Sequence, residues 1–183
     1  MFSNRRILRS LWAGRIVLLA ILAVFCLSPA SRAIAPTPLP AFSVQGLDGS
    51  AVSSTTWPLK GKSFVIYVRG NCRACFALLG HLNKKDYPAL PRHTTIIVSG
   101  VGPVEAQTWL HRYPDLREAT WYLDPSKAAA TALHLQGAPI ILGLKDNVVK
   151  WALSGEMQKT AQQKSVLNTW CKEKEVDSQM ARK

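Results

Sequence analysis

The chain has 183 residues, of which 48% are hydrophobic and 19% are charged. This composition supplies enough apolar material for a core and argues against wholesale disorder. Eleven Gly and eleven Pro exclude a collagen-like or low-complexity chain, and four Cys are too few for a disulfide-dense scaffold. No internal repeat is visible, so the length predicts one domain preceded by a leader.

The first 35 residues have the pattern of an export leader. Four arginines and no acid lie in the first fifteen residues, and twelve apolar residues follow at 16–27. Small residues come next, with Ala33 and Ala35 as candidate cleavage positions, as in a secretory signal peptide. A membrane span needs about twenty apolar residues, so the stretch is short for one. We predict a signal peptide or N-terminal membrane anchor over 1–35, with a buried core helix as a third alternative. In the first two cases the domain lies in a periplasm or at the extracytoplasmic face of the membrane.

Part of the positive charge belongs to this leader. The whole chain has a formal net charge of +12; five arginines and no acid lie within 1–35, so the remaining chain carries +7. Such a charge favours acidic partners or anionic membrane surfaces. The basic residues occur in runs of at most two, without a nucleic-acid-binding motif or an aromatic–basic cluster. We therefore predict no nucleic-acid partner, and membrane contact only through an uncleaved anchor.

After the leader, residues 36–41 have Pro at every second position, which predicts a short extended linker. A domain over 42–172 and a polar tail over 173–183 follow. The predicted strands are a hairpin of Phe42–Val44 and Ala51–Ser53, then Phe64–Val68, Thr94–Val98, Ala119–Leu123, Ile140–Leu142 and Val148–Leu153. The predicted helices are Cys72–Lys84, Pro103–Arg112, Lys127–Leu133 and Met157–Glu175.

Local signals support several of these elements. Asp48-Gly49 is a turn signal within the hairpin, and Asp124-Pro125 reads as a helix N-cap followed by a first-turn proline. The run Phe64–Val68 is apolar throughout, as in a central strand covered on both faces. Strands that alternate with helices predict an α/β fold with a mixed, partly parallel sheet flanked by helices.

The motif Cys72-Arg73-Ala74-Cys75 lies between a predicted strand and a predicted helix. Two cysteines three apart on a first helical turn face the same side, close enough to form a disulfide. Backbone N–H groups at the helix start, together with Arg73 and Arg69, favour a thiolate at Cys72. We predict that Cys72 is the exposed nucleophile and that Cys75 is the buried thiol that resolves the mixed disulfide.

From about Ala41 to Trp170 the chain resembles the thioredoxin superfamily, and within it the TlpA-like extracytoplasmic thiol-disulfide oxidoreductases. The resemblance implies a thioredoxin-like fold with an N-terminal β-hairpin extension. It rests on Phe42-Ser43-Val44 with Asp48-Gly49-Ser50, on Lys60-Gly61-Lys62, on the C-x-x-C motif, on Asp124-Pro125 and on Gly137-Ala138-Pro139.

The same resemblance implies roles for residues and partners. Pro139 would be a cis-proline beside the cysteines, and the Ala138 backbone would pair with an extended client segment. The protein would exchange disulfides with cysteine-containing client proteins, with a lean towards reduction. The dithiol carries the electrons, so no organic cofactor or metal is expected, and a membrane thiol donor would re-reduce a reductase.

Three features depart from the family pattern. Asn71 replaces the usual Trp before the first Cys, and Arg73-Ala74 replaces the Pro-containing dipeptide of many members. The strand Ser63–Val68 contains no acid that could accept a proton, and Glu105 lies in the next helix region. The sequence therefore leaves reduction, oxidation and isomerisation open.

Two other interpretations stay open as well. In an oxidising compartment, the pair could be the inert disulfide of a thioredoxin-fold adaptor. The two thiols could also bind copper or zinc as soft ligands, as in a copper chaperone, although the four histidines lie at no ligand spacing. Cys171 is then either a buried apolar residue of the last helix or an auxiliary thiol.

Overall fold

The structure, a computed structural model, describes residues 36–82, 87, 90–154 and 165–170. The predicted leader, the polar tail and Cys171 lie outside these residues. Within the described ranges, no helix is both long and apolar enough to cross a membrane.

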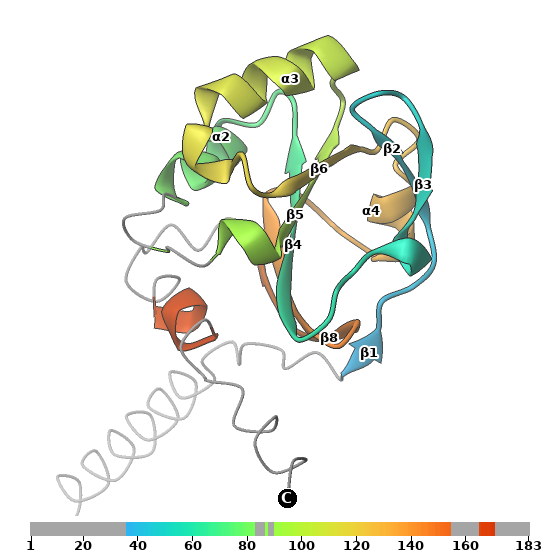
Figure 1. Cartoon of the computed structure of the whole chain (residues 1–183), viewed down its shortest axis with the longest axis vertical. Coiled ribbons are helices and arrows are strands. Elements are labelled where there is room, and N and C mark those ends of the chain that lie inside the picture. Colours follow the sequence, from blue (N-terminus) through green and yellow to red (C-terminus); the bar gives the residue numbers. More distant parts are fainter. Residues whose placement is uncertain (1–35, 83–86, 88–89, 155–164, 171–183) are drawn as a thin grey trace, which may run out of the picture. The chain divides into compact units, whose positions relative to one another are not determined.

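A mixed sheet forms the centre of the fold. Within the described residues it has eight strands in the order β1-β8-β7-β4-β5-β6-β2-β3 (Figure 1). β5 pairs in parallel with β4 and with β6, whereas the other neighbours are antiparallel. This confirms the predicted mixed sheet and places the predicted hairpin, β2 and β3, within it. The strands are β1 (Thr37–Pro38), β2 (Ser43–Gly46), β3 (Ala51–Ser53), β4 (Lys62–Arg69), β5 (Thr94–Ser99), β6 (Thr120–Leu123), β7 (Ile140–Lys145) and β8 (Val148–Ser154).

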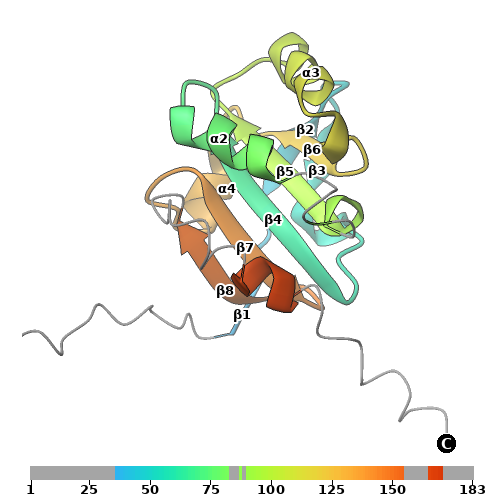
Figure 2. The same cartoon turned by 90° about the vertical axis from the view of Figure 1, so that its left-hand side faces the viewer.

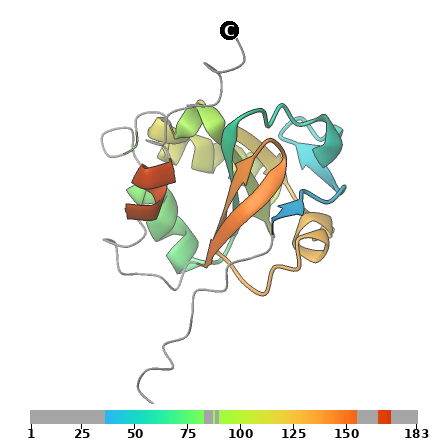
Figure 3. The same ribbon diagram turned by 90° about the horizontal axis from the view of Figure 1, so that it is seen from below.

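Helices cover both faces of this sheet. α2 (Arg73–His81) and α3 (Pro103–Arg112) pack on one face, and α4 (Ala128–Ala132) packs on the other. Figure 2 shows α2 and the red helical segment 165–170 in front of the sheet, and Figure 3 shows α4 on the opposite side. The connections that the structure describes contain the short 3-10 helices η1 (Ser54–Thr56), η2 (Pro91–His93) and η3 (Pro114–Leu116).

β4 is the central strand that its apolar run predicts. Side chains alternate along a strand, so Ile66 and Val68 join the core under α2 and α3, whereas Val65 and Tyr67 join the core under α4. All four are at most 3% exposed. β4 thus separates two distinct cores, and its carboxyl end carries the C-x-x-C motif.

The sheet is tightly packed where β7 pairs with β8. Gly143 lies opposite Trp151, and a Cβ atom at Gly143 would overlap the indole ring. The Trp151 ring meets Phe64 and Trp170 edge-on, with ring centroids 6.1 and 5.6 Å apart. Leu167, only 1% exposed, anchors the segment 165–170 on the same core. This segment is the described part of the predicted helix Met157–Glu175.

Several boundaries differ from the predictions. Thr37 and Pro38, within the predicted linker, pair with Val149 and Val148 at the edge of the sheet. The helix predicted to reach Lys84 ends at His81, with Leu82 as its C-cap. The predicted N-cap position of the fourth helix is wrong, because Lys127 is the cap residue, in the left-handed region at φ 58°. The side chain of Asp124 still accepts hydrogen bonds from the first turn of α4, at the backbone N–H groups of Ala129 and Ala130.

Candidate active site

Directly before the C-x-x-C motif, the chain at Gly70 passes close to the backbone at the end of β5. The Gly70 N–H donates to the Ser99 carbonyl at 2.9 Å. A Cβ atom at Gly70 would lie 2.5 Å from Cγ1 of Val101 and 2.8 Å from the carbonyl oxygen of Gly100. The position therefore suits glycine, since a side chain would push β4 and the loop after β5 apart. The chain turns here directly into Asn71 and Cys72.

Cys72 is the N-cap residue of α2. Its backbone is extended, and its Sγ accepts a hydrogen bond from the Cys75 N–H at 3.1 Å. N-cap side chains normally use oxygen for this purpose, to satisfy an N–H group that has no partner inside the helix. A sulfur held by this donor is stabilised as a thiolate once the disulfide is reduced.

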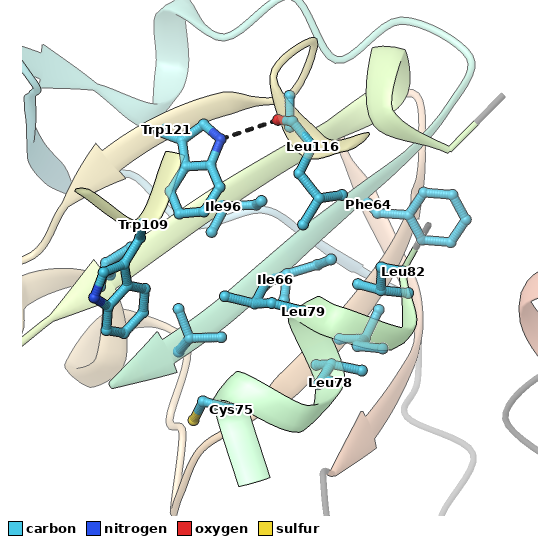
Figure 4. Packing of buried hydrophobic residues seen from close by; sticks show 14 of the residues in the cluster. Phe64, Ile66, Cys75, Leu78, Leu79, Leu82, Ile96, Trp109, Leu116 and Trp121 are labelled. Atoms are coloured by element: carbon cyan, nitrogen blue, oxygen red, sulfur yellow. Dashed lines mark hydrogen bonds between the residues drawn. The ribbon is translucent and has the colours of Figure 1, made fainter. Parts of the chain in front are cut away.

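The two cysteines form a disulfide across the first turn of α2, with their Cα atoms 5.2 Å apart. Their accessibilities differ sharply. Cys75 is fully buried, whereas Cys72 is half-buried and packs only against the edge of the core. Figure 4 shows Cys75 at one end of the apolar cluster formed with Ile66, Leu78 and Leu79. An incoming sulfur can therefore reach Cys72 more readily than Cys75.

The loop before β7 meets the disulfide. The Ala138–Pro139 peptide is cis, as the resemblance predicts. The Ala138 carbonyl oxygen lies 3.6 Å from Cys72 Sγ. Pro139 is buried and Ala138 is half-buried. The structure thus brings together Cys72 and Ala138, which are 66 residues apart in the chain.

Basic side chains flank the motif. Arg73 is the first residue of α2 and Arg69 is the last residue of β4, and both are exposed. Glu105 is exposed in the first turn of α3. Among the described residues, the buried acid is Asp124, and it belongs to the opposite side of β4 from Cys75.

Asp124 forms a polar network that the sequence analysis missed. It is fully buried at the end of β6, and its carboxylate accepts hydrogen bonds from the Tyr67 hydroxyl at 3.2 Å and from the two α4 N–H groups at 3.2 and 3.3 Å. Burial, followed by the Asp124 charge, raises the pKa of Tyr67. Two signals could have found it. Tyr67 places a hydroxyl in the apolar run of β4, and Asp124 directly follows β6, the second parallel strand from β4.

A pocket of about 140 Å³ lies beside this network. It lies next to the loop of the cis-proline, because Gly137 contributes to its wall. Its polar lining consists of Tyr67, Arg69, Ser99, Lys127, Gln136 and Gly137.

The histidines give no metal site. All four are exposed, and His111 Nδ1 lies 2.8 Å from the Gln107 carbonyl of its own helix. Across the described part of the chain, no three or more His, Cys, Asp or Glu side chains form a group that could hold a metal ion.

No known family model matches this sequence, and a comparison with curated proteins gives no match. Solved structures do resemble it. A Neisseria meningitidis protein assigned as a thioredoxin has a TM-score of 0.57 at 19% identity, over 76% of this chain and 93% of its own. A thiol-disulfide oxidoreductase thioredoxin domain from Bacteroides vulgatus has a TM-score of 0.54 at 16% identity, over 71% and 97%. A secreted Mycobacterium tuberculosis disulfide oxidoreductase homologous to E. coli DsbE has a TM-score of 0.51 at 14% identity, over 70% and 95%.

At these identities the likeness establishes the fold. The chain has a thioredoxin fold, as predicted, and its C-x-x-C motif forms a disulfide at the carboxyl end of the central strand. A fold alone does not define an activity, so the function has to be argued from the site.

Proposed function

We propose that this protein is an exported thiol-disulfide oxidoreductase of the TlpA-like type, acting as a reductase of client proteins. One observation carries the proposal. A half-buried Cys72 sulfur is bonded to a fully buried Cys75 and lies 3.6 Å from the Ala138 carbonyl, next to a cis-proline. An inert structural disulfide has no need of one accessible sulfur beside a cis-proline loop.

The reaction follows from this asymmetry. In the reduced protein, the Cys72 thiolate attacks one sulfur of a client disulfide, and the other client sulfur leaves as a thiolate that takes up a proton. The Cys75 thiol then loses its proton and attacks Cys72 Sγ. The client sulfur that was bonded to Cys72 leaves as a thiolate, and the Cys72–Cys75 disulfide forms. Two electrons have then passed to the client. A membrane thiol donor returns the protein to the dithiol.

The surroundings of the cysteines support these roles. The Cys75 N–H and the positive charges of Arg73 and Arg69 favour the Cys72 thiolate over the thiol. The Ala138 backbone, next to the cis-proline Pro139, would pair with an extended client segment. Extracytoplasmic action rests on the predicted leader, and the Mycobacterium tuberculosis neighbour is itself described as secreted.

The test is the reduction of a disulfide-bonded client by the full chain, with serine variants at three cysteines. Cys72→Ser removes the nucleophile, so the exchange is lost, at least a thousandfold in rate. Cys75→Ser leaves the mixed disulfide unresolved, so a covalent complex with the client accumulates on a non-reducing gel. Cys171→Ser is the matched control, and exchange persists in it.

The midpoint potential of the couple decides the direction. A value near that of thioredoxin, about −270 mV, supports a reductase, and one near about −120 mV makes the protein a disulfide donor. A pair that no dithiol buffer reduces would contradict the proposal and favour the adaptor. Stoichiometric Cu(I) binding that either serine variant abolishes, without any exchange, would favour the copper chaperone.

A further inference from the structure

The pocket beside the cis-proline loop has the charge of an anion site. Arg69 and Lys127 line it from two different elements, the end of β4 and the residue before α4. Ser99 and Gln136 add a hydroxyl and an amide. Within the described residues, no carboxylate lies within salt-bridge distance of either cation. The lining thus offers two positive charges that have no carboxylate partner among the described residues. The Ser99 hydroxyl and the Gln136 amide already donate to the Val68 and His134 carbonyls, each at 3.5 Å.

The buried Asp124 does not account for these cations. Its carboxylate already accepts three hydrogen bonds, from Tyr67 and from two backbone N–H groups of α4. A buried carboxylate with three donors is satisfied without a salt bridge. The two cations line an open pocket, where a ligand from solution can reach them.

Lys127 is also held in an unusual conformation. Its φ of 58° lies in the left-handed region, which lysine rarely adopts and which Gly or Asn tolerates better. Strained backbone of this kind is often found at functional positions. The residue in this conformation, Lys127, is one of the two cations that line the pocket.

The pocket lies within reach of a client bound at the disulfide. Its wall includes residues 135–137, which immediately precede Ala138. A strand advances about 3.3 Å per residue, so a client segment paired with Ala138 passes the pocket about one to three residues from its reactive cysteine. We infer that this pocket binds a carboxylate side chain of the client at that distance, and so selects acidic segments. The inference rests on the proposed function and names its substrate class.

The test compares two synthetic peptides that contain an internal disulfide. They are identical except that one has Glu, and the other Gln, at the positions one to three residues from the attacked cysteine. The measurement is the second-order rate constant for reduction of each peptide by the reduced full chain. We expect the Glu peptide to react about tenfold faster at low salt, a difference that shrinks as salt screens the charges.

Charge-removing variants assign the effect to the pocket. Arg69→Gln and Lys127→Gln are each expected to lower the Glu-to-Gln rate ratio to about threefold, and the double variant to about one. The ratio is the informative quantity, because a change in the pKa of Cys72 alters both rates alike. Arg117→Gln, an equal charge change at an exposed residue outside the pocket, leaves the ratio unchanged.

Each outcome separates the two claims. Equal rates for the two peptides overturn the inference and leave the proposed function intact. A preference that survives the double variant, or that Arg117→Gln reduces as much, shows a general field of the basic protein and also overturns the inference. Failure to reduce either peptide contradicts the proposed function itself.

Discussion

Both faces of β4 pack against apolar cores, but only the face toward α4 also carries a buried carboxylate among the described residues. On one face, Ile66 and Val68 share with Cys75 a core composed of apolar side chains. On the other face, Tyr67 donates a hydrogen bond to the buried carboxylate of Asp124, beside a pocket lined by cations. A single strand therefore separates the buried thiol from the buried charge.

In the proposed function, the two sides of β4 would contribute to different steps. The side with Cys75 provides an apolar environment, in which burial disfavours a thiolate. The side with Asp124 fixes the start of α4 and the pocket wall next to the cis-proline loop. In the proposed function, bond exchange and client recognition would thus depend on different cores, and we expect a substitution on one side to leave the other largely intact.

The largest effect is expected when a charge enters the apolar side. Ile66→Asp places a carboxylate without donors beside Cys75, and we expect a loss of about 5 kcal/mol in the free energy of unfolding at neutral pH. Burial raises the pKa of the new carboxyl group above its unfolded value of about 4. The variant is therefore least unstable below about pH 4, and stability is lost as pH rises through the folded-state pKa.

Ile66→Ala is the matched control for this variant. It removes the side chain without adding a charge, and it should cost about 3 kcal/mol with no dependence on pH in the same range. Denaturant unfolding of the full chain at several pH values measures both. Equal stability of the Asp and Ala variants at neutral pH would show that a carboxylate finds partners on this side after all.

The next effect in size comes from removing the charge on the other side. Asp124→Ala leaves the Tyr67 hydroxyl and two α4 N–H groups without their acceptor, and we expect a loss of about 3 kcal/mol. Asp124→Asn keeps one acceptor oxygen and should cost about half as much. Denaturant unfolding gives these values. A loss below about 1 kcal/mol for the alanine variant would mean that water replaces the carboxylate.

Much of this comparison could be predicted from the sequence, but not all. The apolar run at Phe64–Val68 predicts a strand with two covered faces, and the position of Cys72 after it predicts the exposed member of the pair. The pattern at Asp124-Pro125 predicts a cap. It does not show that the helix starts later, at Ala128, or that a left-handed Lys127 precedes it.

The pocket could not be predicted from the sequence, because its residues come together only in the folded chain. Its cations, Arg69 and Lys127, are 58 positions apart by their numbering and occur in no motif. They come together because β4 and β6 lie on either side of β5, so that both loops leave from the same edge of the sheet. Residues that follow two parallel strands meet at the same edge of the sheet only when those strands lie near each other. Their proximity can therefore be recognised only once the strand order is known.

A smaller effect is expected from removing the hydrogen bond between Tyr67 and Asp124. Tyr67→Phe removes one donor to Asp124 and should lower the free energy of unfolding by about 1.5 kcal/mol at neutral pH. Burial and the Asp124 charge raise the pKa of Tyr67, so its stabilising contribution is full below about pH 10 and is lost as pH rises through the folded-state pKa. The variant should therefore lose less stability than the parent protein above that pH.

Tyr122→Phe separates the hydrogen bond from simple burial. Tyr122 stacks on Trp57 at 5.1 Å, burial alone raises its pKa, and within the described residues its hydroxyl has no hydrogen-bond partner. Its removal should reduce the alkaline loss of stability while costing less than about 0.5 kcal/mol at neutral pH. If both tyrosine variants cost the same at neutral pH, the Tyr67–Asp124 bond contributes nothing beyond packing. The polar side of β4 would then be held by the helix N–H groups alone.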